Sequence, residues 1–285
     1  MVRRSIGILG VVLALSSLPT AKAEPARVYV VVVDGNGQPI TGLSSRHFLL
    51  RVDGVEPPIL GVRPATDPPA LVVIVDGYTD FYTLQMRRAL RGVLNVLRAV
   101  APEAHVGFMM SEGSTPPALK HVTRDAAALD REAASFIQRG ASAPMLESIG
   151  VAARVLSEAG PRRLILLLTS QRDSIASSGS AEVTGEAVRR SGASLWALQS
   201  TLPMTQSGVV ENEKVLKTVT RASGGRREQR LTWLIEEHAI AMTRQMLSQY
   251  EVTFELAENG GPGYLRVGVD RQGVEVFAPG WTTLR

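Results

Sequence analysis

The sequence predicts an α/β protein with a doubly wound, mostly parallel sheet and helices on both faces. The first observation is that the apolar runs at 70–75, 164–168 and 194–198 are typical of parallel strands buried on both faces. The second is that stretches of helical periodicity separate these runs. The third is that β-branched, turn-rich segments at 27–62 and 250–277 predict an additional small β unit built from the two ends of the chain.

The size and composition of the chain limit its class. It has 285 residues, of which 45% are hydrophobic and 20% are charged, and it has no cysteine. That length suits one α/β domain with a smaller partner. The composition excludes a disordered tail, and the lack of cysteine excludes a disulfide scaffold, a zinc finger, an iron–sulfur protein and a cysteine enzyme.

The first 23 residues are typical of a secretory signal peptide. Arg3 and Arg4 precede an apolar run over 6–18, and the small residues Ala21 and Ala23 form a cleavage pattern. An uncleaved membrane anchor is the alternative, but the run is shorter than the roughly 18 apolar residues that a spanning helix needs. We therefore expect cleavage near Ala23, a secreted or periplasmic product, and no integral membrane segment after cleavage.

The expected leader also accounts for most of the net charge of +4. It holds three of the 31 basic residues and no acidic one, so the mature chain has 28 basic and 27 acidic residues, a net charge of +1. No run of Lys and Arg and no basic stretch rich in aromatic residues follows. The sequence therefore argues against a nucleic acid as the partner.

The mature chain begins with a β-rich unit over 24–66. Its apolar segments at 27–33, 47–52 and 59–62 are separated by Asp-Gly and Asn-Gly turns, which favour strands and hairpins. A unit of about 40 residues is at the lower limit of independent stability. We therefore expect it to pack against another part of the chain.

An α/β domain over 67–249 follows a proline-containing linker. Its expected strands are 70–75, 106–110, a short one at 119–122, 164–168 and 194–198. Its expected helices are 84–100, 125–138, 145–159, 181–190, 212–222 and a long one over 228–249. In the long helix Leu231, Ile235, His238, Met242 and Met246 recur at helical spacing, which is more typical of a core face than of a cofactor site.

The segment 250–285 returns to β structure, with strands at 250–256, 264–269 and 274–277 separated by glycine-containing turns. Like the segment 24–66, it is too small to fold alone. Both ends of the chain emerge beside the α/β domain. We therefore expect these strands to pack with the N-terminal β unit.

Four stretches carry a resemblance to a known family. They are 31–43 with Phe48, 71–76, 215–226 and 248–250. In order and spacing they resemble the von Willebrand factor type A (VWA) domain, and most closely the secreted bacterial branch known as VWFA-related Acidobacterial domain proteins. The resemblance covers nearly the whole mature chain. It implies a VWA/Rossmann-like fold and a module that binds protein ligands, not an enzyme.

The resemblance also implies the position of a metal-ion-dependent adhesion site. In the family, an Asp-x-Ser-x-Ser loop after the first strand, a Thr from a second loop and an Asp from a third loop hold a magnesium-like cation. The open position of the cation takes a carboxylate of the ligand. Open α/β sheets bind ligands in such a crevice at the carboxyl ends of their strands.

This chain retains only part of that ligand set. Asp76 matches the first aspartate, but Tyr78 and Asp80 stand at the two serine positions. The threonine is missing from the second loop, where Ser142 is the neighbouring hydroxyl, and Ser170 replaces the aspartate of the third loop. A hard cation needs several oxygen ligands. We therefore expect a degenerate site without a cofactor; if Mg²⁺ or Mn²⁺ does bind, Asp76 and Asp80 are the expected ligands.

The leading hypothesis is a secreted, metal-independent VWA-like interaction or scaffold protein with a protein partner. Its expected ligand-binding residues are Asp76, Tyr78, Asp80, Ser142, Ser170 and Asp173. The alternative is cation-dependent adhesion through Asp76, Asp80 and Asp173. A hydrolase in the same crevice is the third hypothesis, which we disfavour because the sequence identifies no histidine as a base beside a serine.

Overall fold

A computed structural model of the chain describes residues 24–76, 80–110, 119, 122–135, 145–169, 180–201, 213–256 and 263–282. The expected leader over 1–23 lies outside these residues. In the described part, no helix has the length and apolar character needed to cross a bilayer.

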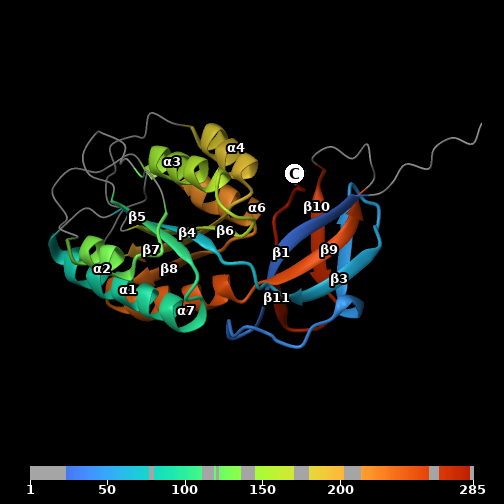
Figure 1. The fold of residues 1–285 in the computed structure, drawn as a ribbon, viewed down its shortest axis with the longest axis horizontal. Coiled ribbons are helices and arrows are strands. Elements are labelled where there is room, and N and C mark those ends of the chain that lie inside the picture. Colours follow the sequence, from blue (N-terminus) through green and yellow to red (C-terminus); the bar gives the residue numbers. More distant parts are fainter. Residues whose placement is uncertain are drawn as a thin grey trace, which may run out of the picture.

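A five-stranded parallel sheet forms the centre of the larger part of the molecule (Figure 1). Its strands are β4 (Ala70–Asp76), β5 (His105–Met110), β6 (Arg163–Thr169), β7 (Ser194–Thr201) and β8 (Arg227–Leu231). They lie in the order β5-β4-β6-β7-β8, and each neighbouring pair is parallel. The apolar runs at 71–75, 164–168 and 195–198 are buried, as the sequence predicts for parallel strands.

Helices cover both faces of this sheet (Figure 1). One face carries α1 (Asp80–Val100), α2 (Ala126–Ser135) and α7 (Ile235–Leu247). The other carries α3 (Met145–Ser157), α4 (Ala181–Ser191), the π-helical turn η2 (Val215–Val219) and α6 (Thr220–Ala222). Trp196 and Leu90 pack in the first interface, and Ile74 and Ile149 pack in the second. The predicted doubly wound α/β architecture is therefore confirmed.

The long helix expected over 228–249 is wrong in its first part. Residues 227–231 form β8, a 3-10 turn η3 (Thr232–Leu234) follows, and α7 begins only at Ile235. Leu231 is thus a strand residue, although its spacing from Ile235 fits a helix. The backbone of β8 pairs in parallel with β7, and this tertiary pairing overrides the helix-favouring Glu, Gln and Arg side chains.

The short strand expected over 119–122 is also not found. Residues 119 and 122 are outside any strand, and residues 120 and 121 lie outside the described residues. Instead Thr123 forms an isolated antiparallel bridge with Val106 of β5. One bridge satisfies both backbone groups of Thr123, but it does not make a ladder.

The two ends of the chain form a β unit of two sheets beside the α/β part (Figure 1). The four-stranded sheet has the order β11-β1-β9-β3, and the second sheet pairs β10 with β2. The strands are β1 (Glu24–Asp34), β2 (Phe48–Val52), β3 (Ile59–Pro64), β9 (Tyr250–Leu256), β10 (Leu265–Val269) and β11 (Val274–Phe277), with the 3-10 turn η1 (Ser45–His47) before β2. Phe48, Val252 and Phe254 pack at its centre. The predicted association of the two chain ends is confirmed.

Strand β1 belongs to both parts of the molecule. Val30 and Val32 point into the core of the β unit, whereas Val31 and Val33 lie in the core of the α/β part. Successive side chains of a strand point to opposite faces, so one apolar run serves two cores.

The two connections between the parts lie at the amino edge of the parallel sheet. The chain leaves the β unit after β3 and enters the beginning of β4, and it returns from the end of α7 into β9. The carboxyl edge of the sheet therefore faces away from the β unit (Figure 1).

Candidate functional site

Two of the six residues predicted from the sequence as a site, Asp76 and Asp80, are at the carboxyl edge of the parallel sheet. Strand β4 ends at Asp76, which is in register with Thr169 at the end of β6, and α1 begins at Asp80. Open α/β sheets bind ligands at this edge. The other four predicted residues, Tyr78, Ser142, Ser170 and Asp173, lie outside the described residues. All six therefore remain predictions as ligand-binding residues.

A row of polar residues crosses this edge from strand to strand. Thr169 of β6 is in register with Gln199 of β7, and Gln199 is in register with Gln229 of β8. Thr169 and Gln199 are buried, with exposed fractions of 0% and 5%. The three side chains share one face because neighbours in register point the same way. Strands β6 and β7 thus change from apolar to polar at the place where a ligand would meet them, beside the polar strand β8.

Arg227 fixes the end of this row. Its Nη2 donates to Oε1 of Gln199 at 2.6 Å and to Oε1 of Glu213 at 2.9 Å. Nε2 of Gln229 also donates to Gln199 Oε1, at 2.9 Å. Only 13% of the Arg227 side chain is exposed. Charge-assisted hydrogen bonds of this kind are about twice as strong as neutral ones, so the side chains are held in place.

Exposed apolar residues lie at the same edge. Trp233 is 62% exposed in η3, the turn that follows the carboxyl end of β8. Leu84 is 51% exposed near the beginning of α1, and η3 contacts α1. Polar groups held by hydrogen bonds and exposed apolar side chains therefore occur together at the carboxyl edge.

An acidic and basic cluster lies on the other face of β8. The carboxylate of Glu228 is 8% exposed and lies 2.9 Å from Nε of Arg226, 3.2 Å from Nη2 of Arg230 and 3.3 Å from Nδ1 of His238. His238 is therefore partly buried, as the sequence predicts, and it joins α7 to β8. In the described part of the chain, no three Asp, Glu or His residues lie close enough to hold a metal ion.

A second polar cluster lies at the opposite, amino edge. Arg162 precedes β6 and is only 4% exposed. Its Nε donates to Oε1 of Gln249 at 2.7 Å, its Nη1 donates to the carbonyl of Asp67 at 3.3 Å, and its Nη2 donates to the carbonyl of Leu247. Burial lowers the pKa of the Arg162 guanidinium to about 10. This arginine therefore contacts both connections between the two parts.

The hydroxyl of Tyr29 extends this cluster into the β unit. It donates to Oδ2 of Asp67 at 2.7 Å. Burial, and then the hydrogen bond to this carboxylate, raise the pKa of Tyr29 above its ordinary value. Arg27 is nearby, with Nη1 3.6 Å from the same Asp67 oxygen.

Comparisons with known proteins find likeness in structure but not in sequence. No protein-family model and no curated protein matches the chain. A von Willebrand factor type A protein from Catenulispora acidiphila is similar over 94% of this chain and 76% of its own, with a TM-score of 0.50 and 12% identity. At that identity the likeness concerns the fold alone.

Two further structures are similar at a lower level. The SpRpn10 VWA domain is 11% identical, with a TM-score of 0.44, over 60% of this chain and 93% of its own. Proximal thread matrix protein 1 from the mussel byssus has zinc in its metal-ion-dependent adhesion site (MIDAS) motif. It is 10% identical, with a TM-score of 0.44, over 65% of this chain and 49% of its own.

Proposed function

From the von Willebrand factor type A fold of this chain, we propose that it is a protein-interaction module. It binds its partner at the carboxyl edge of the parallel sheet. The observation that carries the proposal is the combination of fixed polar groups around Gln199 and Arg227 with the exposed Trp233 at that edge. Trp and Arg are enriched among the residues that dominate protein interfaces. Side chains that are already held in place lose little entropy on binding.

We extend this surface to the loops beside it. In the sequence, Asp76 ends β4, Tyr78 follows it and Asp80 begins α1. Ser142 precedes α3, and Ser170 and Asp173 follow β6. Loops at the carboxyl ends of neighbouring parallel strands meet at one edge, which supports their inclusion.

We propose that binding requires no divalent cation. The sequence keeps Asp76 but has Tyr78 and Ser170 at positions where the family supplies metal ligands. Mg²⁺ gives up its water reluctantly and needs near-octahedral oxygen coordination. Cation-dependent adhesion through Asp76, Asp80 and Asp173 remains the alternative, because carboxylates are good ligands of hard cations.

Calorimetric titration with Mg²⁺, Mn²⁺ and Ca²⁺ tests this point, with the melting temperature followed in parallel. We expect no heat of binding and no change in melting temperature. A stabilisation that Asp76→Ala removes would overturn metal independence and favour the alternative.

Capture of partners from a cell-envelope extract tests the carboxyl edge itself. We expect Trp233→Ala to reduce the amount of captured partner about tenfold or more, the effect of a residue that dominates an interface. The matched control is Tyr264→Ala, which truncates an aromatic residue that is 81% exposed in the β unit. Equal capture by wild type and Trp233→Ala would contradict the proposed surface.

We further propose that the protein acts outside the cytoplasm and is not an enzyme. The signal-like sequence over 1–23 supports the first point, and N-terminal sequencing of the exported protein should begin at Glu24. The absence of a histidine paired with a serine in the sequence pattern supports the second. A panel of esterase and peptidase substrates should show no turnover; turnover would favour a hydrolase.

A further inference from the structure

Strand β1 has a neighbour on one side only over half of its length. The sheet order places β1 between β11 and β9. Strand β9 pairs with residues 24–30 of β1, and β11 pairs with residues 31–34. On the β11 side, residues 25–30 therefore pair with no strand in the described part of the chain.

The chain itself turns away from this edge. After β11 ends at Phe277, Pro279 bridges to Ser223 of the α/β part and Trp281 bridges to Tyr264. The backbone N–H of Gly280 donates to the carbonyl of Ala222 at 2.8 Å. This segment is thus tied to other elements, and a gap is left where β11 would have continued along β1.

The register shows which backbone groups face the gap. After the turn at 35–37, the chain returns along β1: Ile40 N–H donates to the carbonyl of Val32, and Asp34 N–H donates to that of Gln38. Strand β11 occupies one side of β1 there, so this return lies on the β9 side. The even-numbered residues of β1 therefore point their backbone N–H and C=O groups toward β9. The direction of these groups alternates along a strand, so those of Arg27 and Tyr29 point into the gap.

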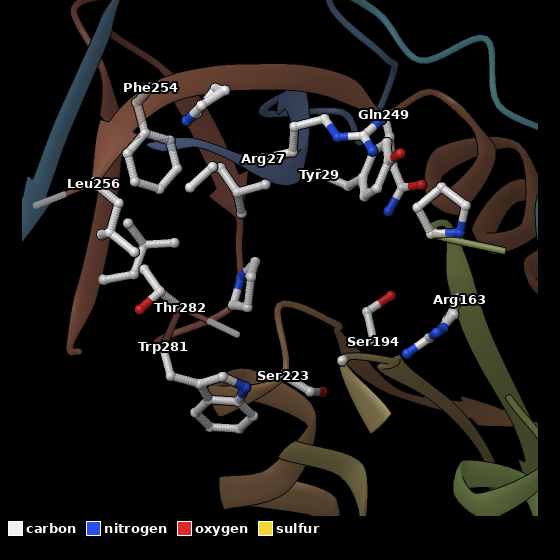
Figure 2. Close-up of a pocket in the computed structure, with 17 residues that line it drawn as sticks. Arg27, Tyr29, Arg163, Ser194, Ser223, Gln249, Phe254, Leu256, Trp281 and Thr282 are labelled. Atoms are coloured by element: carbon white, nitrogen blue, oxygen red, sulfur yellow. The ribbon is translucent and has the colours of Figure 1, made fainter. Parts of the chain in front are cut away.

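A cavity of about 250 Å³ follows this free edge (Figure 2). Residues 25–29 of β1 line one side, and Ser194, Trp281 and Thr282 lie across from them. Ser194 begins β7, so the cavity is at the amino edge of the parallel sheet, opposite the site proposed above.

The cavity offers hydrogen-bond donors at one end and apolar groups at the other. Arg27 lines it, and its Nη1 lies 3.6 Å from Asp67 and 4.0 Å from Glu251, so the guanidinium is near two carboxylates but is still half exposed. Arg163 also lines the cavity, but its nitrogens donate to the backbone carbonyls of residues 157, 159, 160 and 191. None of the described lining residues is acidic. Gln249 is only 6% exposed; its Oε1 accepts from Arg162, while its Nε2 donates to none of the described residues. Figure 2 shows Arg27, Gln249 and Arg163 on one side of the open space, and Phe254 and Trp281 on the other.

We propose that the free edge of β1 binds an extended peptide segment of a partner protein as an additional strand. The backbone groups of Arg27 and Tyr29 are two residues apart, about 6.6 Å along the strand, and only another extended backbone repeats at that spacing. An acidic side chain of the peptide lies beside Arg27 and Gln249, and an apolar one lies toward Trp281. This surface is distinct from the carboxyl edge. If no peptide binds at β1, the function proposed for the carboxyl edge is therefore not affected.

Amide hydrogen exchange in the free protein tests the edge directly. The amides of Arg27 and Tyr29 should exchange quickly, because they face the cavity, while that of Val28 should be protected by its pairing with Val252 of β9. Equal protection of Arg27, Val28 and Tyr29 would show that the edge is occupied and would overturn the proposal.

Selection from a library of random seven-residue peptides then tests binding. We expect peptides with an acidic residue, and addition of a selected peptide should protect the amides of Arg27 and Tyr29. Arg27→Pro removes the N–H that faces the cavity but no bond to β9, so it should weaken binding about tenfold or more. Arg27→Gln keeps that N–H, so it should weaken the binding of acidic peptides less than Arg27→Pro does.

Arg98→Gln is the matched control, since Arg98 on α1 is 43% exposed with an ion pair to Asp130, comparable with Arg27 at 48%. It should bind the selected peptides like wild type. Circular dichroism and the melting temperature establish that each variant is folded, and Tyr29→Pro repeats the test at the second free N–H. Failure to select any peptide, or equal affinity for wild type and both folded proline variants, would overturn the proposal.

Discussion

Arg162 joins the two chain segments that connect the β unit with the parallel sheet. It donates to the carbonyl of Asp67 in the first connection, and to the carbonyl of Leu247 and the amide of Gln249 in the second. Burial of a guanidinium without an acidic partner in direct contact is costly, and three fixed acceptors offset that cost. The residue therefore matters to stability in proportion to how completely its hydrogen bonds are satisfied.

We predict that Arg162→Met destabilises the protein by about 3 kcal/mol, because it leaves buried acceptors without a donor. The measurement is the free energy of unfolding in urea. Arg98→Met is the control: its single exposed ion pair with Asp130 should be worth less than about 1 kcal/mol. Equal losses in the two variants would contradict this role of Arg162.

Tyr29 gives a prediction for the pH dependence of stability. Its folded pKa is raised above the ordinary value of about 10, so its contribution is complete below pH 10 and is lost as the pH rises through the folded pKa. Tyr29→Phe should be less stable than wild type by about 1 kcal/mol at pH 8. This difference should shrink between pH 10 and 11.5.

Urea denaturation of both proteins across that pH range measures the difference, in which groups common to both cancel. Tyr264→Phe is the control, since Tyr264 is 81% exposed and its substitution should show no such trend. A difference that is constant with pH would argue against the buried contact between Tyr29 and Asp67.

The candidate site was predictable from the sequence only in part. The position of Asp76 followed from a buried apolar run that ends in a carboxylate, and the structure places it at the end of β4. Gln199 and Arg227 were missed because residues 228–231 were expected to be helical. The role of Gln199 depends on its position beside β8, which the local sequence does not show. The signal that was present is the change from apolar to polar directly after 194–198.

The turn between α6 and β8 depends on two glycines in succession. Gly224 has a φ of 78°, in the left-handed region that favours glycine. Gly225 lies against β7, where an added Cβ would be 1.8 Å from the carbonyl oxygen of Leu195. The turn can thus deliver β8 to its place beside β7 only with glycine at these positions.

We predict that Gly225→Ala destabilises the protein by about 3 kcal/mol or more, since backbone must move to admit the methyl group. Gly150→Ala is the matched substitution. Gly150 lies inside α3 with open space at its Cβ position, so alanine should raise the free energy of unfolding by about 0.5–1 kcal/mol. Thermal melts followed by circular dichroism compare the two. A mild effect of Gly225→Ala would mean that β8 is not held as described.

At the level of elements, strands that are buried on both faces were easiest to predict, because a short, uninterrupted apolar run between polar segments is typical of a parallel strand. The error at 228–249 arose where a polar edge strand precedes a helix without a break. Residues 227–231 have no apolar alternation, and their strand state depends on hydrogen bonds to β7. Such dependence on a partner cannot be seen in a local pattern.

The whole molecule depends on β1, whose two faces are buried in different cores. Val31 and Val33 contact the core that contains Trp196 and Met246, while Val30 and Val32 contact that of the β unit. The uninterrupted valines at 30–33 fit a strand without an exposed face. The sequence predicted that the chain ends associate, but which face of β1 meets which core depends on tertiary packing.

We predict that the β unit and the α/β part unfold in a single transition. Calorimetry should give equal calorimetric and van't Hoff enthalpies. Val33→Ala should lower the stability of the whole by about 2 kcal/mol without splitting the transition, because it removes methyl groups from the shared region. Val55→Ala, at a side chain that is 70% exposed, is the control. Two separate transitions would show that β1 does not couple the parts.

The first and last described segments of the chain both lie in the β unit, and this has a mechanical consequence. The described chain begins at β1 and ends at residue 282 beside β10, whereas the whole α/β part lies between β3 and β9. A force applied between Glu24 and Thr282 is carried by the ladders of β1 with β9 and with β11, and by the contacts of residues 279–280 with residues 222–223. The carboxyl edge of the parallel sheet lies at the opposite end of the α/β part from these contacts, so we expect it to keep its geometry under a load that they withstand.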